Sequence, residues 1–171
     1  ASCLVGSEMC IRDSNKPEWV FFEIACHANG GMSLGVYRDT LDDEVGYLVK
    51  SAKVKFAYAE DQEQVDKLIN VQKKLKTKIK VIYDDPRGLE KLKNPNVINM
   101  KDLASEGKKQ LDKNNKLYEN LINKVSGETI SVLCTTSGTT SNPKLAMLPA
   151  NKFINHISNY LKVDPKSHLD E

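Results

Sequence analysis

The sequence predicts an α/β fold with a parallel sheet, and two observations carry that prediction. Short apolar runs of strand length recur along the chain, and segments with helical periodicity separate most of them. Strands that alternate with helices of about ten or more residues are typical of right-handed β-α-β units, which form parallel sheets. The runs expected as strands are 32–37, 54–59, 79–83, 96–100 and 129–134.

Helices that flank the sheet are expected in the intervening segments. Residues 17–28 are apolar nearly all round, so this helix should be buried on several sides. The next helix carries an apolar stripe that begins at Leu41, and Asp61 is placed to cap a third helix. A single long polar helix is expected from residue 101 to about residue 125, and a last helix is expected over residues 151–161.

The first 14 residues show no periodicity that assigns them to a helix or a strand. We therefore expect residues 1–14 to be a non-native or irregular N-terminal segment that lies outside the fold. Residues 15–171 are then expected to form part of one domain. Both ends of the sequence look cut, so we expect the chain to be a fragment of a longer protein.

Composition and charge exclude several classes of protein. The 25 Lys and Arg residues nearly balance the 23 Asp and Glu residues, and a net charge of +2 gives no reason to expect a nucleic-acid partner. No apolar run approaches the roughly 20 residues that span a bilayer, so no transmembrane segment is expected. The four cysteines lack metal-ligand spacing, and Cys134 is expected in the core.

The clearest chemical signal lies between Thr135 and Lys144. Five of the first six residues in this stretch are Thr or Ser, and Gly138 lies between them. Hydroxyl groups and the backbone N–H groups that a glycine allows to converge can bind phosphate oxygens, and the Lys144 ammonium adds positive charge. The stretch follows a predicted buried strand, where α/β sheets place their ligands. From the residues alone, an ordinary surface turn explains the stretch equally well.

The residues from Thr136 to Lys144 resemble the T-S-G-T-T-G-x-P-K-G signature of the AMP-forming adenylating enzymes, which include acyl-CoA synthetases and luciferases. Two residues depart from the pattern, because Ser141 and Leu145 stand where the signature has glycine. Upstream, residues 15–19 are similar to the N-x-P-E-W motif of the long-chain acyl-CoA synthetases. The further segments that resemble this branch are 31–37, 60–67 and 83–88, so the similarity covers nearly all of residues 15–171.

The resemblance implies an ATP-dependent ligase that activates a fatty carboxylate as an acyl-adenylate and then transfers it to coenzyme A. The implied substrates are ATP with Mg²⁺, a fatty acid and coenzyme A. No catalytic residue is implied within this part of the enzyme, and Thr139 and Thr140 would lie nearest the metal. The residues implied to bind ATP are Thr136, Ser137, Gly138, Thr139, Thr140, Ser141 and Lys144.

The resemblance also implies that the chain is part of a large N-terminal domain and lacks the C-terminal part of the enzyme. We therefore expect this fragment alone to be inactive. Its partners would be small molecules, its location cytoplasmic, and a long-chain substrate would allow peripheral contact with the inner face of a membrane. Two alternatives stay open: a CoA ligase or adenylation domain for another acid, and a nucleotide-binding module without catalysis.

Overall fold

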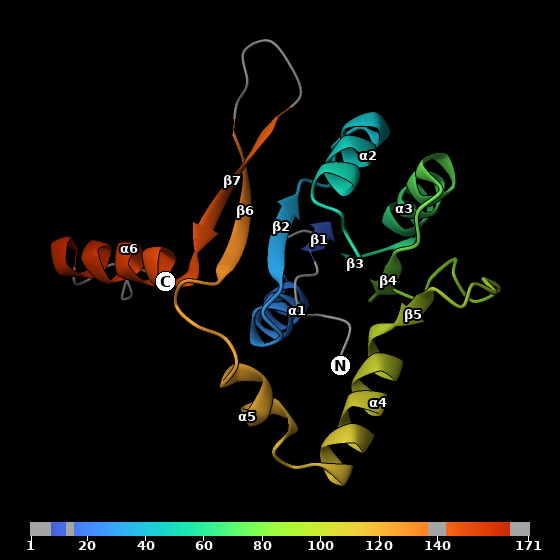
Figure 1. The fold of residues 1–171 in the computed structure, drawn as a ribbon. Helices are drawn as coiled ribbons and strands as arrows, with labels where there is room; N and C mark the ends of the chain where they lie inside the picture. The colour runs from blue at the N-terminus through green and yellow to red at the C-terminus, as the bar shows by residue number, and fades with distance from the viewer. Residues whose placement is uncertain (1–7, 13–15, 137–142, 165–171) are drawn as a thin grey trace.

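Seven strands form one sheet in the order β5-β4-β3-β1-β2-β6-β7 in the computed structural model of the protein (Figure 1). The structure describes residues 8–12, 16–136 and 143–164. All pairs among strands β1 to β6 are parallel, whereas β7 turns back antiparallel to β6. The strands are β1 (Glu8–Arg12), β2 (Met32–Val36), β3 (Phe56–Ala59), β4 (Lys80–Tyr83), β5 (Val97–Asn99), β6 (Ile130–Thr136) and β7 (Lys144–Pro149).

Helices connect most of the parallel strands, and this architecture confirms the predicted α/β fold class. The chain winds outward from β1 in both directions, through β2 to one side and through β3 to the other. Within the described ranges, no helix is both long and apolar enough to cross a membrane. The helices are α1 (Pro17–Ala28), α2 (Asp42–Ser51), α3 (Gln62–Leu75), α4 (Met100–Lys113), α5 (Leu117–Ile122) and α6 (Ala150–Val163).

Consecutive residues of the central strands point to opposite faces of the sheet, and each face has its own core. In β3, Ala57 belongs to the core covered by α2 and α3, whereas Tyr58 belongs to the core covered by α1. The α2/α3 core is the larger one and includes the fully buried Val45 and Leu68. The α1 core contains Phe22, whose ring centroid lies 5.7 Å from that of Tyr58.

The N-terminal strand β1 lies in the middle of the sheet. The Cα partner of Cys10 is Leu34 on the β2 side and Ala57 on the β3 side. The expectation that residues 1–14 lie outside the fold is therefore wrong for Glu8–Arg12. Its sequence, EMCIR, places charged residues at both ends and lacks the longer apolar run that predicted most of the other strands. Its place in the sheet is set by hydrogen-bonded neighbours on both sides, which a local pattern does not reveal.

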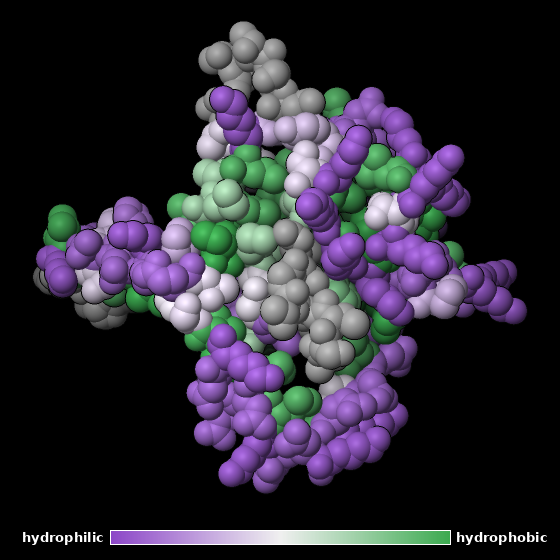
Figure 2. Space-filling model, viewed as in Figure 1, coloured by the Kyte–Doolittle hydropathy of each residue, from purple (hydrophilic) through white to green (hydrophobic). Residues whose placement is uncertain are grey.

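Two helices differ from the expectation. The polar segment expected to be one helix is divided into α4 and α5, because Asn114 leaves the helical region at φ −146° and ψ 89°. The Asn114 side chain accepts a hydrogen bond from the N–H of Lys116, which competes with a continuous helix. In α1 only one side packs on the sheet, so Phe22 is 8% exposed and its neighbour Phe21 is 60% exposed. Figure 2 shows hydrophilic side chains over α4 and α5.

Two single residues also differ from the expectation. Leu41 precedes α2 as its N-cap residue and is 76% exposed, so it does not belong to the buried stripe of that helix. Cys134 is exposed, whereas a place in the core was expected. The reason is that β6 pairs with β2 only at Val132 and Leu133, and Cys134 extends beyond that pairing.

Replacing Leu68 with alanine should destabilise the protein by about 3 kcal/mol, because truncating a buried leucine leaves a cavity between α3 and the sheet. The matched control is Leu41→Ala, which removes the same atoms from an exposed side chain. That control should change the free energy of unfolding by less than about 0.5 kcal/mol. Urea denaturation followed by circular dichroism measures both variants, and equal losses would contradict the packing described for the α2/α3 core.

Candidate functional site

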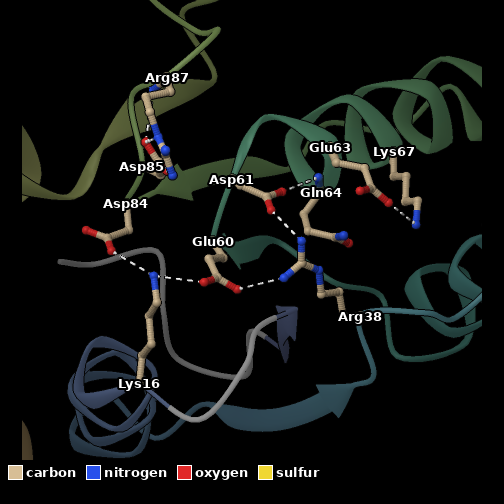
Figure 3. Close-up of polar contacts among 10 residues, drawn as sticks. All are labelled: Lys16, Arg38, Glu60, Asp61, Glu63, Gln64, Lys67, Asp84, Asp85 and Arg87. Atoms are coloured by element: carbon tan, nitrogen blue, oxygen red, sulfur yellow. Dashed lines mark hydrogen bonds and ion pairs between the residues drawn. The ribbon is translucent and has the colours of Figure 1, made fainter.

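The carboxyl ends of the parallel strands meet at one edge of the sheet, which is where open α/β folds bind their ligands. Two polar features follow the strands at this edge. One is the hairpin formed by β6 and β7, which carries the hydroxyl-rich loop. The other is a set of charged side chains in the segments after β1, β2, β3 and β4 (Figure 3). This edge is therefore the candidate site.

The stem of the β6–β7 hairpin is fixed to the sheet. Its antiparallel register pairs Thr136 with Lys144 at the loop end and Leu133 with Met147 further from the loop. On its other side, Leu133 pairs with Leu34 of β2, so β6 also belongs to the parallel part of the sheet. The Thr136 hydroxyl donates to the carbonyl oxygen of Lys144 at 3.4 Å. The two ends of the loop are thus held side by side (Figure 1).

The structure places two of the predicted ATP-binding residues. Thr136 and Lys144 face each other at the end of the stem, and both are exposed. The Lys144 ammonium carries donors that suit an anion, whereas the Thr136 hydroxyl donates its proton to the Lys144 carbonyl oxygen. Among the residues that the structure describes, no group of three or more His, Cys, Asp or Glu residues is placed to hold a metal ion. The remaining predicted residues lie outside the described ranges: Ser137, Gly138, Thr139, Thr140 and Ser141.

The first residues of β7 are anchored by Leu145, which stands where the signature of the adenylating enzymes has glycine. Leu145 pairs with Thr135 across the stem and packs, partly buried, against the α2/α3 core. The fold therefore accommodates a side chain at this position. An apolar contact here restrains the backbone next to Lys144, which favours a fixed exit from the loop.

A partly buried polar cluster joins α1, β2 and β6. Ser33 is 2% exposed, and its hydroxyl donates to Oε1 of Glu23 at 2.7 Å. The same hydroxyl oxygen lies 3.2 Å from Nε2 of His27 and 3.3 Å from the carbonyl oxygen of Ser131. Buried polar groups are stable when they are paired in this way. The Ser33 hydroxyl connects the first residues of β6 to β2 through Ser131, and its contact with His27 is a structural one.

Charged side chains join the segments that follow β1, β2, β3 and β4 (Figure 3). Nζ of Lys16 lies 2.8 Å from Oε1 of Glu60 and 3.6 Å from Oδ2 of Asp84. Nη1 of Arg38 lies 3.7 Å from Oε2 of the same glutamate, and Nη2 donates to Oδ2 of Asp61 at 3.0 Å. The Glu60 side chain is central to this network and only 13% exposed. We call these five residues the Glu60 network.

Sequence reasoning missed the Glu60 network, because its members are far apart in the sequence. A signal was available, since Arg38, Glu60 and Asp84 each follow directly after a run expected to form a strand. The carboxyl ends of parallel strands meet at one edge, so charged residues in these positions are expected to come together. The network connects neighbouring strand ends and so stabilises the edge at which the hairpin lies.

Asp85 lies beside the Glu60 network and is held by Arg87. Oδ1 of Asp85 accepts hydrogen bonds from the backbone N–H and from Nε of Arg87, both at 3.0 Å. Hydrogen bonding from the Arg87 side chain, and then from its backbone, lowers the pKa of Asp85 from 3.8 to about 2. The carboxylate therefore stays ionised near neutral pH, and this pair shapes the turn instead of supplying a proton.

The fold, the position of the hairpin and the sequence of its loop agree with one family. The family described as AMP-binding enzyme matches residues 5–170, and the chain belongs to this family. The match begins within the first 14 residues, which agrees with the place of β1 in the sheet.

Similar proteins are much longer than this chain. Long-chain-fatty-acid–CoA ligase 5 of Rattus norvegicus is 32% identical over 151 residues, which cover 86% of this chain and 22% of the relative. The luciferase-like enzyme of Zophobas morio has a similar structure, with a TM-score of 0.66 and 12% identity over 92% of this chain and 33% of its own. The structure of ATP-bound MatB of Rhodopseudomonas palustris has a TM-score of 0.59 and 15% sequence identity, and the match covers 92% of this chain and 27% of MatB. The chain thus spans about a fifth of the curated relatives' length.

The carboxyl group of Asp85 should titrate with a pKa of about 2, and Arg87→Gln should raise that pKa toward 3.8. The folded pKa lies below the unfolded one. The stability from this pair is therefore complete above about pH 4 and is lost as the pH falls toward 2. Carbon-detected NMR follows the titration. Lys91→Gln removes a positive charge outside these contacts and should leave the pKa of Asp85 unchanged. An equal shift of the Asp85 pKa in both variants would contradict the assignment of the shift to Arg87.

Proposed function

We propose that the chain is the part of an AMP-forming long-chain fatty acid–CoA ligase that binds the phosphates of ATP. The observation that carries the proposal is the β6–β7 hairpin, which holds Thr136 and Lys144 side by side at the carboxyl edge of the parallel sheet. Membership of the AMP-binding enzyme family supports it, as do relatives named long-chain-fatty-acid–CoA ligases. MatB, whose fold is similar, has a structure with bound ATP.

The proposed reaction has two steps. A carboxylate oxygen of the fatty acid attacks the α-phosphorus of ATP, and the bond to pyrophosphate breaks with its electrons on the leaving group. The thiol of coenzyme A then loses its proton to solvent as its sulfur bonds to the acyl carbon, and AMP leaves with the electrons of the broken bond. Because charge develops on phosphate oxygens in the first step, positioned cations and N–H donors accelerate it. Mg²⁺ enters with ATP as part of that substrate.

We assign the phosphates of ATP to the loop that the hairpin presents. Thr136 and Ser137–Thr140 would surround the β- and γ-phosphates, with the hydroxyls of Thr139 and Thr140 nearest Mg²⁺. Ser141 would contribute a further hydroxyl, and the Lys144 ammonium would pair with pyrophosphate as it forms and leaves. Charge-assisted contacts of this kind suit phosphoryl groups, because catalysis of phosphoryl transfer depends mainly on positioning and charge.

The names of the relatives support a long-chain acid as the substrate, and coenzyme A as the acceptor. We assign no acid-binding residue within this chain and place that site in the rest of the enzyme. Long acyl chains partition into membranes, so we propose a cytoplasmic enzyme that works at the inner face of a membrane. A longer form of the enzyme that activates short-chain or amino acids in preference to long-chain acids would overturn the substrate assignment.

The chain alone should show no fatty-acid-dependent exchange of pyrophosphate into ATP. The reason is that it spans about a fifth of the length of the relatives, so most of the proposed enzyme is missing from it. Incorporation of labelled pyrophosphate into ATP measures the exchange, and the longer enzyme serves as the positive control. Robust exchange by the isolated chain would show that the active site is complete within these residues.

In the longer enzyme, Lys144→Ala should lower kcat/KM for ATP about tenfold to a hundredfold, because a charged contact to the reacting phosphates is lost. Lys144→Arg should retain more activity than Lys144→Ala, because the positive charge is kept. Lys152→Ala, which removes an exposed lysine from α6, is the matched control and should leave the ATP kinetics unchanged. Unchanged ATP kinetics in Lys144→Ala would exclude a role for this lysine.

A further inference from the structure

α6 is anchored at its N-terminal end and projects sideways from the sheet beyond β7 (Figure 1). The N–H of Ala150 donates to the carbonyl oxygen of Thr129 at 3.0 Å. The N–H of Asn151 donates to the carbonyl oxygen of Gly127 at 2.8 Å. The Asn151 side-chain amide also donates to Oε1 of Glu128 at 2.5 Å. These bonds fix the direction of the helix where it leaves the sheet, and the later turns extend away from it.

The projecting helix carries an apolar stripe. Five large side chains recur at positions i, i+1, i+4, i+7 and i+8, which places them on one face of a helix. No residue from Ala150 to Val163 is buried, and each of the five side chains is 43–63% exposed. Figure 2 shows both hydrophobic and hydrophilic side chains on the surface of this helix. The α6 stripe consists of Phe153, Ile154, Ile157, Tyr160 and Leu161.

A helix of this length is stable only when its apolar face is buried against another surface. In water, isolated helices of 14 residues are marginal, because their own hydrogen bonds barely offset the cost of ordering the backbone. The hydrogen bonds at Ala150 and Asn151 secure only the first turn. The rest of α6 therefore depends on burial of the stripe, as amphipathic helices of globular proteins do.

The polar side of α6 favours a protein cover over a membrane. Helices that lie on membranes carry Lys and Arg along the polar face, whereas only two lysines occur in α6, near its ends. A covering polypeptide is available, because the relatives are about five times as long as the matched part of this chain. The other polar residues of α6 are neutral or weakly basic: Asn151, Asn155, His156, Ser158 and Asn159.

We propose that the α6 stripe is the surface against which the remainder of the same enzyme's polypeptide packs, an inference that rests on the longer CoA ligase proposed above. α6 follows β7 directly, and β7 carries Lys144 at its other end. Packing on the stripe therefore fixes the exit of the hairpin relative to the rest of the enzyme. The stripe is a positioning surface for the ATP-binding loop and touches no substrate.

Amide hydrogen exchange in the longer enzyme and in the isolated chain tests the docking surface. The amides of residues 153–163 should exchange about tenfold to a hundredfold more slowly in the longer enzyme, because burial of apolar side chains there opposes opening of the helix. Ile157→Asp should remove that protection in the longer enzyme and lower its melting temperature. Asn155→Asp places the same charge on the polar side and should change neither quantity.

Ile157→Ala is the second variant in case Ile157→Asp prevents folding of the longer enzyme, and it should reduce the protection in part. Equal exchange rates in the longer enzyme and the isolated chain would overturn the proposal. Protection of residues 153–163 that rises with protein concentration would assign the stripe to an interface with a second copy of the chain. Protection that requires anionic vesicles would assign the stripe to a membrane surface. Either result would also overturn the proposal. ATP affinity is not part of this test, so its outcome is separate from that of the ATP-binding proposal.

Discussion

The double pairing of β6 is the contact on which the candidate site depends. On one side, Leu133 pairs with Leu34 and holds the strand in the parallel sheet. On the other side, the register that joins Thr136 to Lys144 turns the chain back at the carboxyl edge. Without this stem, the ends of the loop would have to be ordered when the ligand binds, at a cost in conformational entropy. Because the stem orders both ends of the loop in the folded chain, this part of the entropy cost does not arise when the ligand binds.

The cations at the carboxyl edge have different roles, and their partners distinguish them. Lys16 and Arg38 contact the carboxylate of Glu60, so their charge is largely compensated within the Glu60 network. A cation beside a carboxylate attracts a further anion less strongly, because the two opposite charges oppose each other in their effect on that anion. Lys144 lies on the hairpin stem, next to the hydroxyl-rich loop. Lys16 and Arg38 are thus paired within the Glu60 network, whereas Lys144 is the cation that we propose for binding phosphate.

The local sequence pattern is sufficient to predict an element when the residues that start or stabilise that element lie within it. Asp61 caps α3 as expected, and its Oδ1 accepts a hydrogen bond from the N–H of Gln64. Tertiary contacts decided the N-terminal strand, because Glu8–Arg12 has a paired neighbour on each side. The end of α4 depends on a local competition that periodicity does not reveal, since the Asn114 side chain accepts a hydrogen bond from the backbone N–H of Lys116. The loop was visible as one contiguous stretch, whereas the residues around Glu60 come together only when the strand ends meet.

The most direct test of phosphate binding by the hairpin is a crystal structure of the longer enzyme with a non-hydrolysable ATP analogue. We expect phosphate oxygens within hydrogen-bonding distance of the backbone N–H groups and hydroxyls of residues 137–142, with Nζ of Lys144 beside the β- or γ-phosphate. A triphosphate bound elsewhere on the enzyme, with the hairpin loop making no contact to it, would contradict this function of the β6–β7 hairpin.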